Sequence, residues 1–122
     1  MIRRLSAATA CLLASSVVAQ ETPDTSTGVG ATVRALDTLN GTVEDIEMRS
    51  GSSRKFGKIE ISLKECRFPT ANPSQDAYAF LTVLDERQTD PSFEGWMLAS
   101  SPALSSLEHQ RYDVWVLACI TE

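Results

Sequence analysis

The sequence has little of what most catalytic and metal sites are built from. A single histidine, His109, occurs in 122 residues, and no G-x-S-x-G segment presents a serine nucleophile. His109 has no second imidazole and no cysteine cluster to share a zinc ion with, although Glu108 and Asp113 lie close in sequence. The sequence therefore predicts no metal site and no cofactor.

Basic residues are scarce as well. The chain has 11 Lys and Arg against 16 Asp and Glu, a net charge of −5. Nucleic-acid binding depends on neutralising phosphates with Lys and Arg, so this composition argues against a nucleic-acid partner. It argues equally against docking on anionic lipid by charge alone.

Long hydrophobic runs are absent except at the N-terminus. Arg3 and Arg4 precede an uncharged, mostly apolar run over Ala7–Ala19, the layout of a secretory signal peptide cut after Ala19. A transmembrane anchor would need about 20 apolar residues, so we expect residues 1–19 to be removed, with no stable membrane insertion afterwards. Cys11 lies inside the run rather than after it, which does not fit a lipid-modified cysteine.

Removal of residues 1–19 leaves two cysteines, Cys66 and Cys119, and changes the net charge to 9 − 16 = −7. Exported domains with two cysteines usually pair them, so we predict a disulfide; two buried free thiols are the alternative. The closed loop of 119 − 66 = 53 residues would stabilise the fold by about 4 kcal/mol in the chain-entropy model.

The remaining chain divides into a flexible leader, residues 20–30, and a single β domain, residues 31–122. The leader has no apolar periodicity, whereas the domain alternates apolar and polar residues between turn signals. Seven strands are expected: Ala31–Asp37, Thr42–Arg49, Arg54–Phe56, Lys58–Cys66, Ala77–Glu86, Phe93–Ala99 and Tyr112–Ile120. The pattern predicts an all-β fold, a small antiparallel sandwich or partly open barrel with one short helical turn.

Three local expectations test this interpretation. Asn40-Gly41 predicts a hairpin turn, because both residues tolerate a positive φ. Strict alternation would put Cys66 on the outer face, so either a bulge lies near Glu65 or the strand ends at a corner. Ala77–Glu86 and Tyr112–Ile120 are apolar on both faces, which predicts central strands.

The helical turn is expected after Ser100. Ser101 can cap it, and Pro102 suits the first helical position. Leu104 and Leu107 are three residues apart and are predicted to face inward together.

One constellation of residues raises the question of catalysis. A hydrolase would use Ser100 or Ser101 as the nucleophile with His109 and Asp113, although a triad is defined by geometry and not by spacing. In the simpler interpretation, His109 and Tyr112 satisfy backbone groups where the chain re-enters the sheet.

The two tryptophans also allow two interpretations. Trp96 and Trp115 are flanked by apolar residues, which is typical of core positions. Exposure of either ring would instead give a platform for a carbohydrate or a peptide.

Residues Gly95–Cys119 carry the pattern G-W-M-x-A-S-S-P-A-L-x-x-L-x-H-x-x-Y-D-V-W-V-x-x-C. With Ala35–Met48 and Phe56–Pro69, this segment resembles the exported alphaproteobacterial family called domain of unknown function 2155. That family commonly has proline where Gln110 stands, so the corner is slightly less rigid here. The resemblance implies a small periplasmic domain without an assigned activity, in a Gram-negative cell, and gives a weak indication of a respiratory-complex partner.

These observations favour an exported, non-enzymatic binding or accessory module whose partner is an envelope protein. The alternatives are a carbohydrate- or peptidoglycan-binding domain that uses a tryptophan, and a small hydrolase that uses Ser101, His109 and Asp113.

Overall fold

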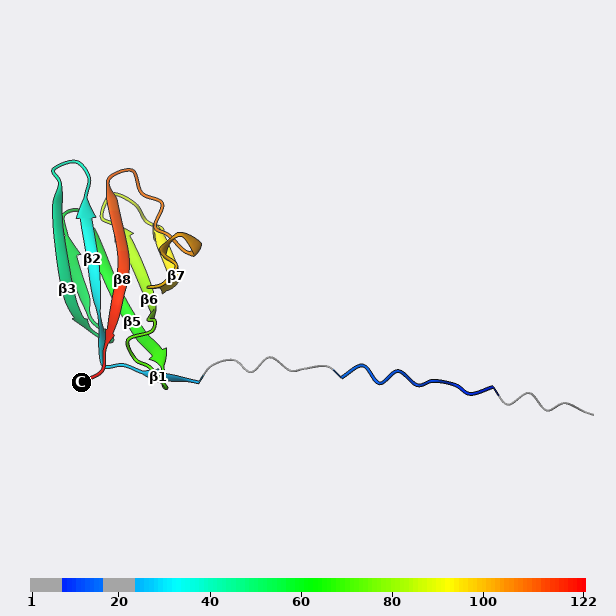
Figure 1. The fold of residues 1–122 in the computed structure, drawn as a ribbon. Coiled ribbons are helices and arrows are strands. Elements are labelled where there is room, and N and C mark those ends of the chain that lie inside the picture. Colours follow the sequence, from blue (N-terminus) through cyan, green and yellow to red (C-terminus); the bar gives the residue numbers. More distant parts are fainter. Residues whose placement is uncertain (1–7, 17–23) are drawn as a thin grey trace, which may run out of the picture.

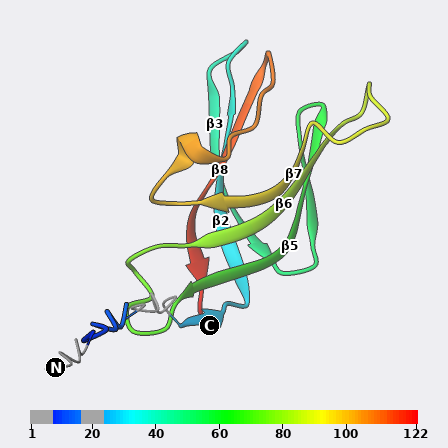
Figure 2. The same ribbon diagram turned by 90° about the vertical axis from the view of Figure 1, so that its right-hand side faces the viewer.

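The computed structural model describes residues 8–16 and 24–122. The described part contains one 3-10 turn, η1 (Pro102–Leu104), and eight strands: β1 (Thr25–Thr27), β2 (Gly30–Asp37), β3 (Thr42–Arg49), β4 (Ser53–Phe56), β5 (Ile59–Pro69), β6 (Tyr78–Asp85), β7 (Phe93–Leu98) and β8 (Tyr112–Ile120). A five-stranded sheet has the order β1-β5-β6-β7, with β4 also on β5, and a three-stranded sheet has the order β3-β2-β8. All pairings are antiparallel, and the two sheets face each other as a sandwich (Figures 1 and 2). The sandwich alternative is therefore confirmed.

The core forms because each strand points every second side chain between the sheets. Val33 and Val116 from the small sheet and Ile61 and Leu81 from the large one are at most 1% exposed. The predicted bounds of Thr42–Arg49 and Tyr112–Ile120 match β3 and β8, and Gly41 adopts a positive φ of 74° in the predicted hairpin turn.

A disulfide joins Cys66 and Cys119, whose Cα atoms are 5.7 Å apart, so the predicted pairing is confirmed. Because Cys66 lies on β5 and Cys119 on β8, the bond crosses from one sheet to the other. It therefore holds β8 against the opposite sheet.

Two bulges bring the cysteines together. In β5 the register shifts between Leu63 and Glu65, which confirms the predicted bulge. In β8 the pairing leaves Leu117 as the extra residue, since Val116 and Ala118 pair with consecutive residues of β2. An extra residue reverses the alternation of side chains. Strict alternation would have placed each cysteine on the outer face of its sheet, and each bulge turns its cysteine inward, to the core side.

The flexible leader predicted for residues 20–30 ends earlier than predicted. Thr25–Thr27 pair with Arg67–Pro69 as β1, and the Gly28 N–H donates to the Cys66 carbonyl at 2.7 Å. Residues 24–30 therefore lie on the domain, and β5 continues to Pro69, beyond the predicted strand end at Cys66. Backbone pairing drives this contact, which apolar periodicity does not reveal; residues 20–23 lie outside the described part.

Only one of the two strands predicted to be central is central. β6 lies between β5 and β7, although its outward residues are only half-buried. Within the described residues β8 pairs with β2 alone and is an edge strand. Its outward-facing Trp115 is half-buried and lines a surface depression, so an apolar outer face does not require a second neighbouring strand.

The helical turn begins at Pro102, as predicted, but two details differ. Ser101 makes no side-chain capping hydrogen bond, and Leu104 is 77% exposed while Leu107 is buried. The turn ends at Leu104 and the following Ser105 is extended, so Leu107 lies outside the turn and its side chain need not share a face with Leu104.

Residues 8–16 contain neither helix nor strand, and their side chains are exposed. The Arg3 and Arg4 positions and the Ala19 cleavage point of the expected signal peptide lie outside the described residues. No helix in the described ranges is long and apolar enough to cross a membrane.

Candidate functional site

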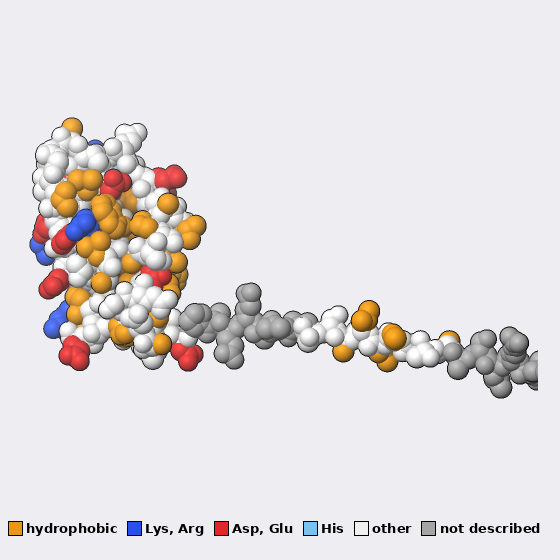
Figure 3. All heavy atoms as spheres, in the orientation of Figure 1, with side chains coloured by type: hydrophobic (Ala, Val, Ile, Leu, Met, Phe, Trp, Pro, Cys, Tyr) orange, Lys and Arg blue, Asp and Glu red, His pale blue; other side chains and the backbone are white. Residues whose placement is uncertain are grey.

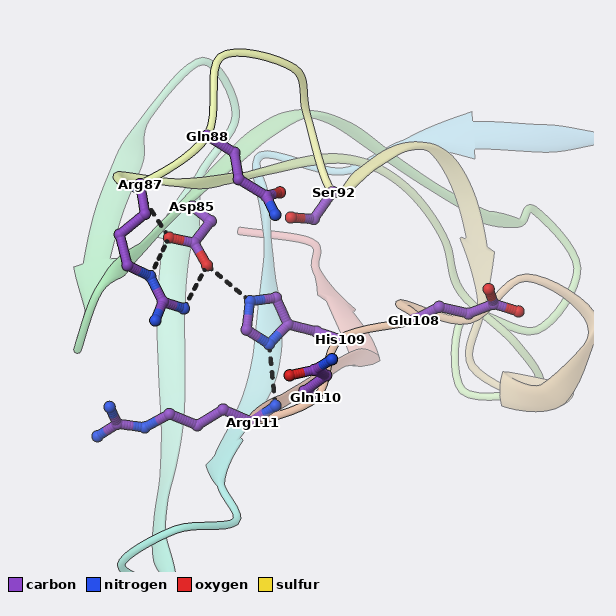
Figure 4. Close-up of a pocket in the computed structure, with 8 residues that line it drawn as sticks. All are labelled: Asp85, Arg87, Gln88, Ser92, Glu108, His109, Gln110 and Arg111. Carbon is purple, nitrogen blue, oxygen red and sulfur yellow. Dashed lines mark hydrogen bonds and ion pairs between the residues drawn. The ribbon is translucent and has the colours of Figure 1, made fainter.

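His109 is the centre of a hydrogen-bonded network where β6 and β2 end and β8 begins (Figure 4). Its Nδ1 lies 3.0 Å from the Arg111 amide nitrogen and 3.2 Å from that of Tyr112. A backbone N–H only donates, so Nδ1 is the acceptor and Nε2 carries the proton. Nε2 therefore donates to Asp85 Oδ2, at 2.8 Å.

Asp85 is 2% exposed and is held from several directions. The Arg87 guanidinium donates two hydrogen bonds to it, at 3.0 and 2.7 Å, and the Arg87 backbone N–H adds a third at 2.9 Å. These contacts with Arg87, and then the one with His109, hold the pKa of Asp85 well below its usual range. The carboxylate is thus a charged anchor between the β6–β7 loop and the segment before β8.

A second buried carboxylate repeats this arrangement. Asp37 is 4% exposed and accepts two hydrogen bonds from the Arg111 guanidinium, at 3.0 and 2.8 Å. The same guanidinium lowers the pKa of Asp37. Sequence reasoning missed both carboxylates, although a signal existed: each continues the inward-facing alternation of its strand, Ala31 to Asp37 in β2 and Ala79 to Asp85 in β6.

Tyr112 is fully buried beside this network. Its hydroxyl accepts from the Lys58 N–H at 2.9 Å, and its ring meets Phe56 edge-on, with 6.0 Å between ring centroids. The hydroxyl also lies against Gly57, whose φ is +58° and whose missing side chain leaves room for it. His109 thus satisfies backbone N–H groups where the chain re-enters the sheet, the role predicted by the simpler interpretation, whereas Tyr112 satisfies the Lys58 N–H in the turn between β4 and β5.

A polar hollow of about 360 Å³ opens beside His109. Around it lie Gln88, Ser92, Glu108 and Gln110 with the network residues (Figure 4). The Ser92 hydroxyl oxygen is buried and has no hydrogen-bond partner in the described part of the chain. The hollow offers hydrogen bonds to a polar group, and no cluster of three metal-ligating side chains occurs among residues 8–16 and 24–122.

The residues of the hydrolase hypothesis do not form a triad in this structure. Both ring nitrogens of His109 are engaged, by Asp85 on one side and by backbone N–H groups on the other. Ser100 donates to Asp76, at 2.6 Å between the hydroxyl and carboxylate oxygens, and so ties the end of β7 to the start of β6. Asp113 is exposed and lines a different depression.

That second depression is an apolar groove between η1 and β8, with a volume of about 470 Å³. We call it the β8 groove, and its lining consists of Pro102, Ala103, Ser106, Leu107, Asp113, Val114 and Trp115. Trp115 is half-buried, so part of its ring is presented to solvent. Hydrophobic side chains gather over β2 and β8 and continue toward η1 (Figure 3).

Trp96 belongs to a different surface. It lies on β7, 41% exposed, and meets Phe80 edge-on with 5.5 Å between ring centroids. The Lys64 ammonium lies 5.3 Å from the Phe80 ring centroid. Trp96, Trp115 and His109 therefore lie at three separate places, on the large sheet, in the β8 groove and beside the polar hollow.

Comparison with known proteins places the chain among bacterial relatives. A family model described as "Uncharacterized protein conserved in bacteria (DUF2155)" matches residues 31–119. A Rickettsia prowazekii (strain Madrid E) protein, "Uncharacterized protein RP359", is 34% identical over 88 residues, which is 70% of this chain. The match spans 57% of the length of that relative. No solved structure matches the chain. Since the family model covers nearly the whole β sandwich, including both cysteines and the His109 network, the chain belongs to the DUF2155 family.

Proposed function

We propose that this domain is an exported, non-enzymatic accessory module that binds another protein of the cell envelope through the β8 groove. The observation that carries the proposal is an apolar groove with a partly exposed tryptophan beside an edge strand. Tryptophan in a desolvated pocket is among the strongest anchors of protein interfaces. An envelope complex, including a respiratory one, supplies partners of this kind.

Two features support the compartment and the class of activity. A disulfide across the sandwich is typical of an oxidising compartment such as the periplasm. His109, the one imidazole in the sequence, uses both ring nitrogens to hold the fold, which favours a structural role over general-base catalysis. These features support the periplasm as the proposed compartment, reached after removal of the expected signal peptide.

Site-specific photo-crosslinking in the native bacterium tests the proposal. A photoreactive amino acid replaces Leu104, which is 77% exposed beside the groove, or Leu39, which is 75% exposed at the tip of the β2–β3 hairpin. We expect a discrete crosslinked envelope protein from position 104 and none from position 39. Identical products from both positions, or none from position 104, would contradict the proposal.

A second candidate function rests on Trp96. A ring that is 41% exposed, supported edge-on by Phe80, is suited to stacking on a sugar, which favours carbohydrate or peptidoglycan binding. Sedimentation with purified sacculi tests it: Trp96→Ala would abolish co-sedimentation, whereas Trp115→Ala would leave it unchanged. The absence of co-sedimentation by the unmodified protein would end this candidate.

A further inference from the structure

We infer that the segment bound in the β8 groove is an extended, basic peptide stretch of the partner that pairs with β8 as an added strand. The inference rests on the proposed function and specifies how the partner is recognised. In this mode, backbone hydrogen bonds to the sheet edge supply affinity and side-chain contacts supply specificity.

The backbone of β8 is free on the side that faces the groove. Arg111 accepts a hydrogen bond from Thr38 on the β2 side, whereas the Tyr112 N–H turns the other way, to His109. Successive residues of a strand direct their backbone N–H and C=O groups to opposite sides. Val114 and Val116 stand two and four residues after Tyr112, so their N–H and C=O groups, like the Tyr112 N–H, point away from β2. Within the described residues β8 pairs with β2 only, so these N–H and C=O groups have no strand partner (Figure 2).

The other edge of the same sheet is protected by its charges. β3 carries Glu44, Asp45, Glu47 and Arg49 within eight residues, and charged side chains discourage pairing at an edge. The stretch Val114–Ile120 has no charged residue at all. Of the two edges of the three-stranded sheet, β8 is therefore the one suited to accept another strand.

The groove also specifies which side chains the added strand should carry. Pro102, Ala103 and the half-buried Trp115 offer an apolar surface, and Asp113 is the single charged residue of the lining among the described residues. An apolar residue next to a Lys or Arg complements this surface. A second copy of this acidic chain does not complement the surface, since it would bring another Asp113 and a net charge of −7 (9 − 16) after signal-peptide removal.

The test is an NMR titration of the ¹⁵N-labelled domain, residues 20–122 in disulfide form, with acetyl-KVKVKVK-amide. We expect the Val114 and Val116 amides to shift and to exchange with solvent about tenfold more slowly, because each gains a hydrogen-bond acceptor. The matched control peptide carries an N-methyl group on every backbone nitrogen of its residues, which preserves charge and side chains but removes the N–H donors from both edges of the peptide. It should bind about tenfold more weakly or worse. The acidic peptide acetyl-EVEVEVE-amide should also bind more weakly.

Each outcome decides a specific question. Equal binding of the N-methylated peptide, or shifts without protection at Val114 and Val116, would overturn strand addition, as would no binding at all. If photo-crosslinking at Leu104 still captured an envelope protein, the proposed function would stand and only the mode of recognition would fall. If the peptide paired with β8 but no envelope protein were crosslinked, the mode of recognition would stand and the proposed function would fall.

Discussion

Removal of the disulfide should destabilise the domain by roughly 4 kcal/mol. The bond between Cys66 and Cys119 closes a 53-residue loop, and the chain-entropy model converts that length into about 4 kcal/mol. The structure adds a reason to expect the full amount, since the bond joins two sheets and holds β8, whose one strand partner among the described residues is β2, against β5. For a domain of this size the loss is a large share of the usual 5–15 kcal/mol, as an order of magnitude.

Urea unfolding of the Cys66→Ala/Cys119→Ala variant, followed by circular dichroism, measures this loss. Unmodified protein treated with a reductant is the matched control, and its unfolding curve should approach that of the variant. A change below about 1 kcal/mol in both samples would refute the reasoning, because the constraint on the unfolded chain would then contribute little. Two free thiols in protein purified from the periplasm would refute it more directly.

Two further predictions concern the Tyr112 corner and the buried carboxylates. Gly57→Ala should cost more stability than Gly41→Ala: both positions have a positive φ, which costs about 1–2 kcal/mol, but only the methyl group at Gly57 would collide with Tyr112. Denaturant midpoints compare the two variants, and equal losses would contradict the packing. Asp37 and Asp85 have pKa values below the ordinary range in the folded state, so their stabilisation is complete above about pH 4 and is lost as pH falls further. The melting temperature should therefore drop between about pH 4 and pH 2, and a flat profile would contradict the role of the two arginine–aspartate pairs.

The core strands were predictable because turn residues separate them and each buries apolar side chains. Thr42–Arg49 alternates Ile46 and Met48 with acidic residues, Tyr112–Ile120 is apolar on both faces, and the bounds of both match the structure. β1 escaped prediction because Thr25–Thr27 contribute backbone hydrogen bonds and no apolar face. The position of β8 at an edge escaped as well, since side chains point to the two faces of a sheet and do not report whether a strand pairs along each side.

The candidate site was predictable only in part. His109 and Tyr112 stand out by composition and position, and both satisfy backbone N–H groups, His109 where the chain re-enters the sheet and Tyr112 in the turn between β4 and β5. The acidic partners of His109 and Arg111 lie far away in sequence, Asp85 by 24 residues from His109 and Asp37 by 74 from Arg111. Such pairings depend on which strand ends meet in the sandwich. The β8 groove likewise exists only once η1 is placed beside β8.

Filling the β8 groove tests the central claim most directly. Ala103 is exposed and lines the groove, so Ala103→Trp should block it without disturbing the core, while Leu39→Trp adds the same side chain at the distant hairpin tip. The measurement is the amount of the envelope partner, identified by crosslinking, that is recovered when each variant is affinity-purified from the cell envelope. The two variants are compared only if their melting temperatures are equal and their disulfides are intact. The account predicts recovery reduced by about tenfold or more for Ala103→Trp and unchanged for Leu39→Trp. Undiminished recovery with Ala103→Trp would contradict it.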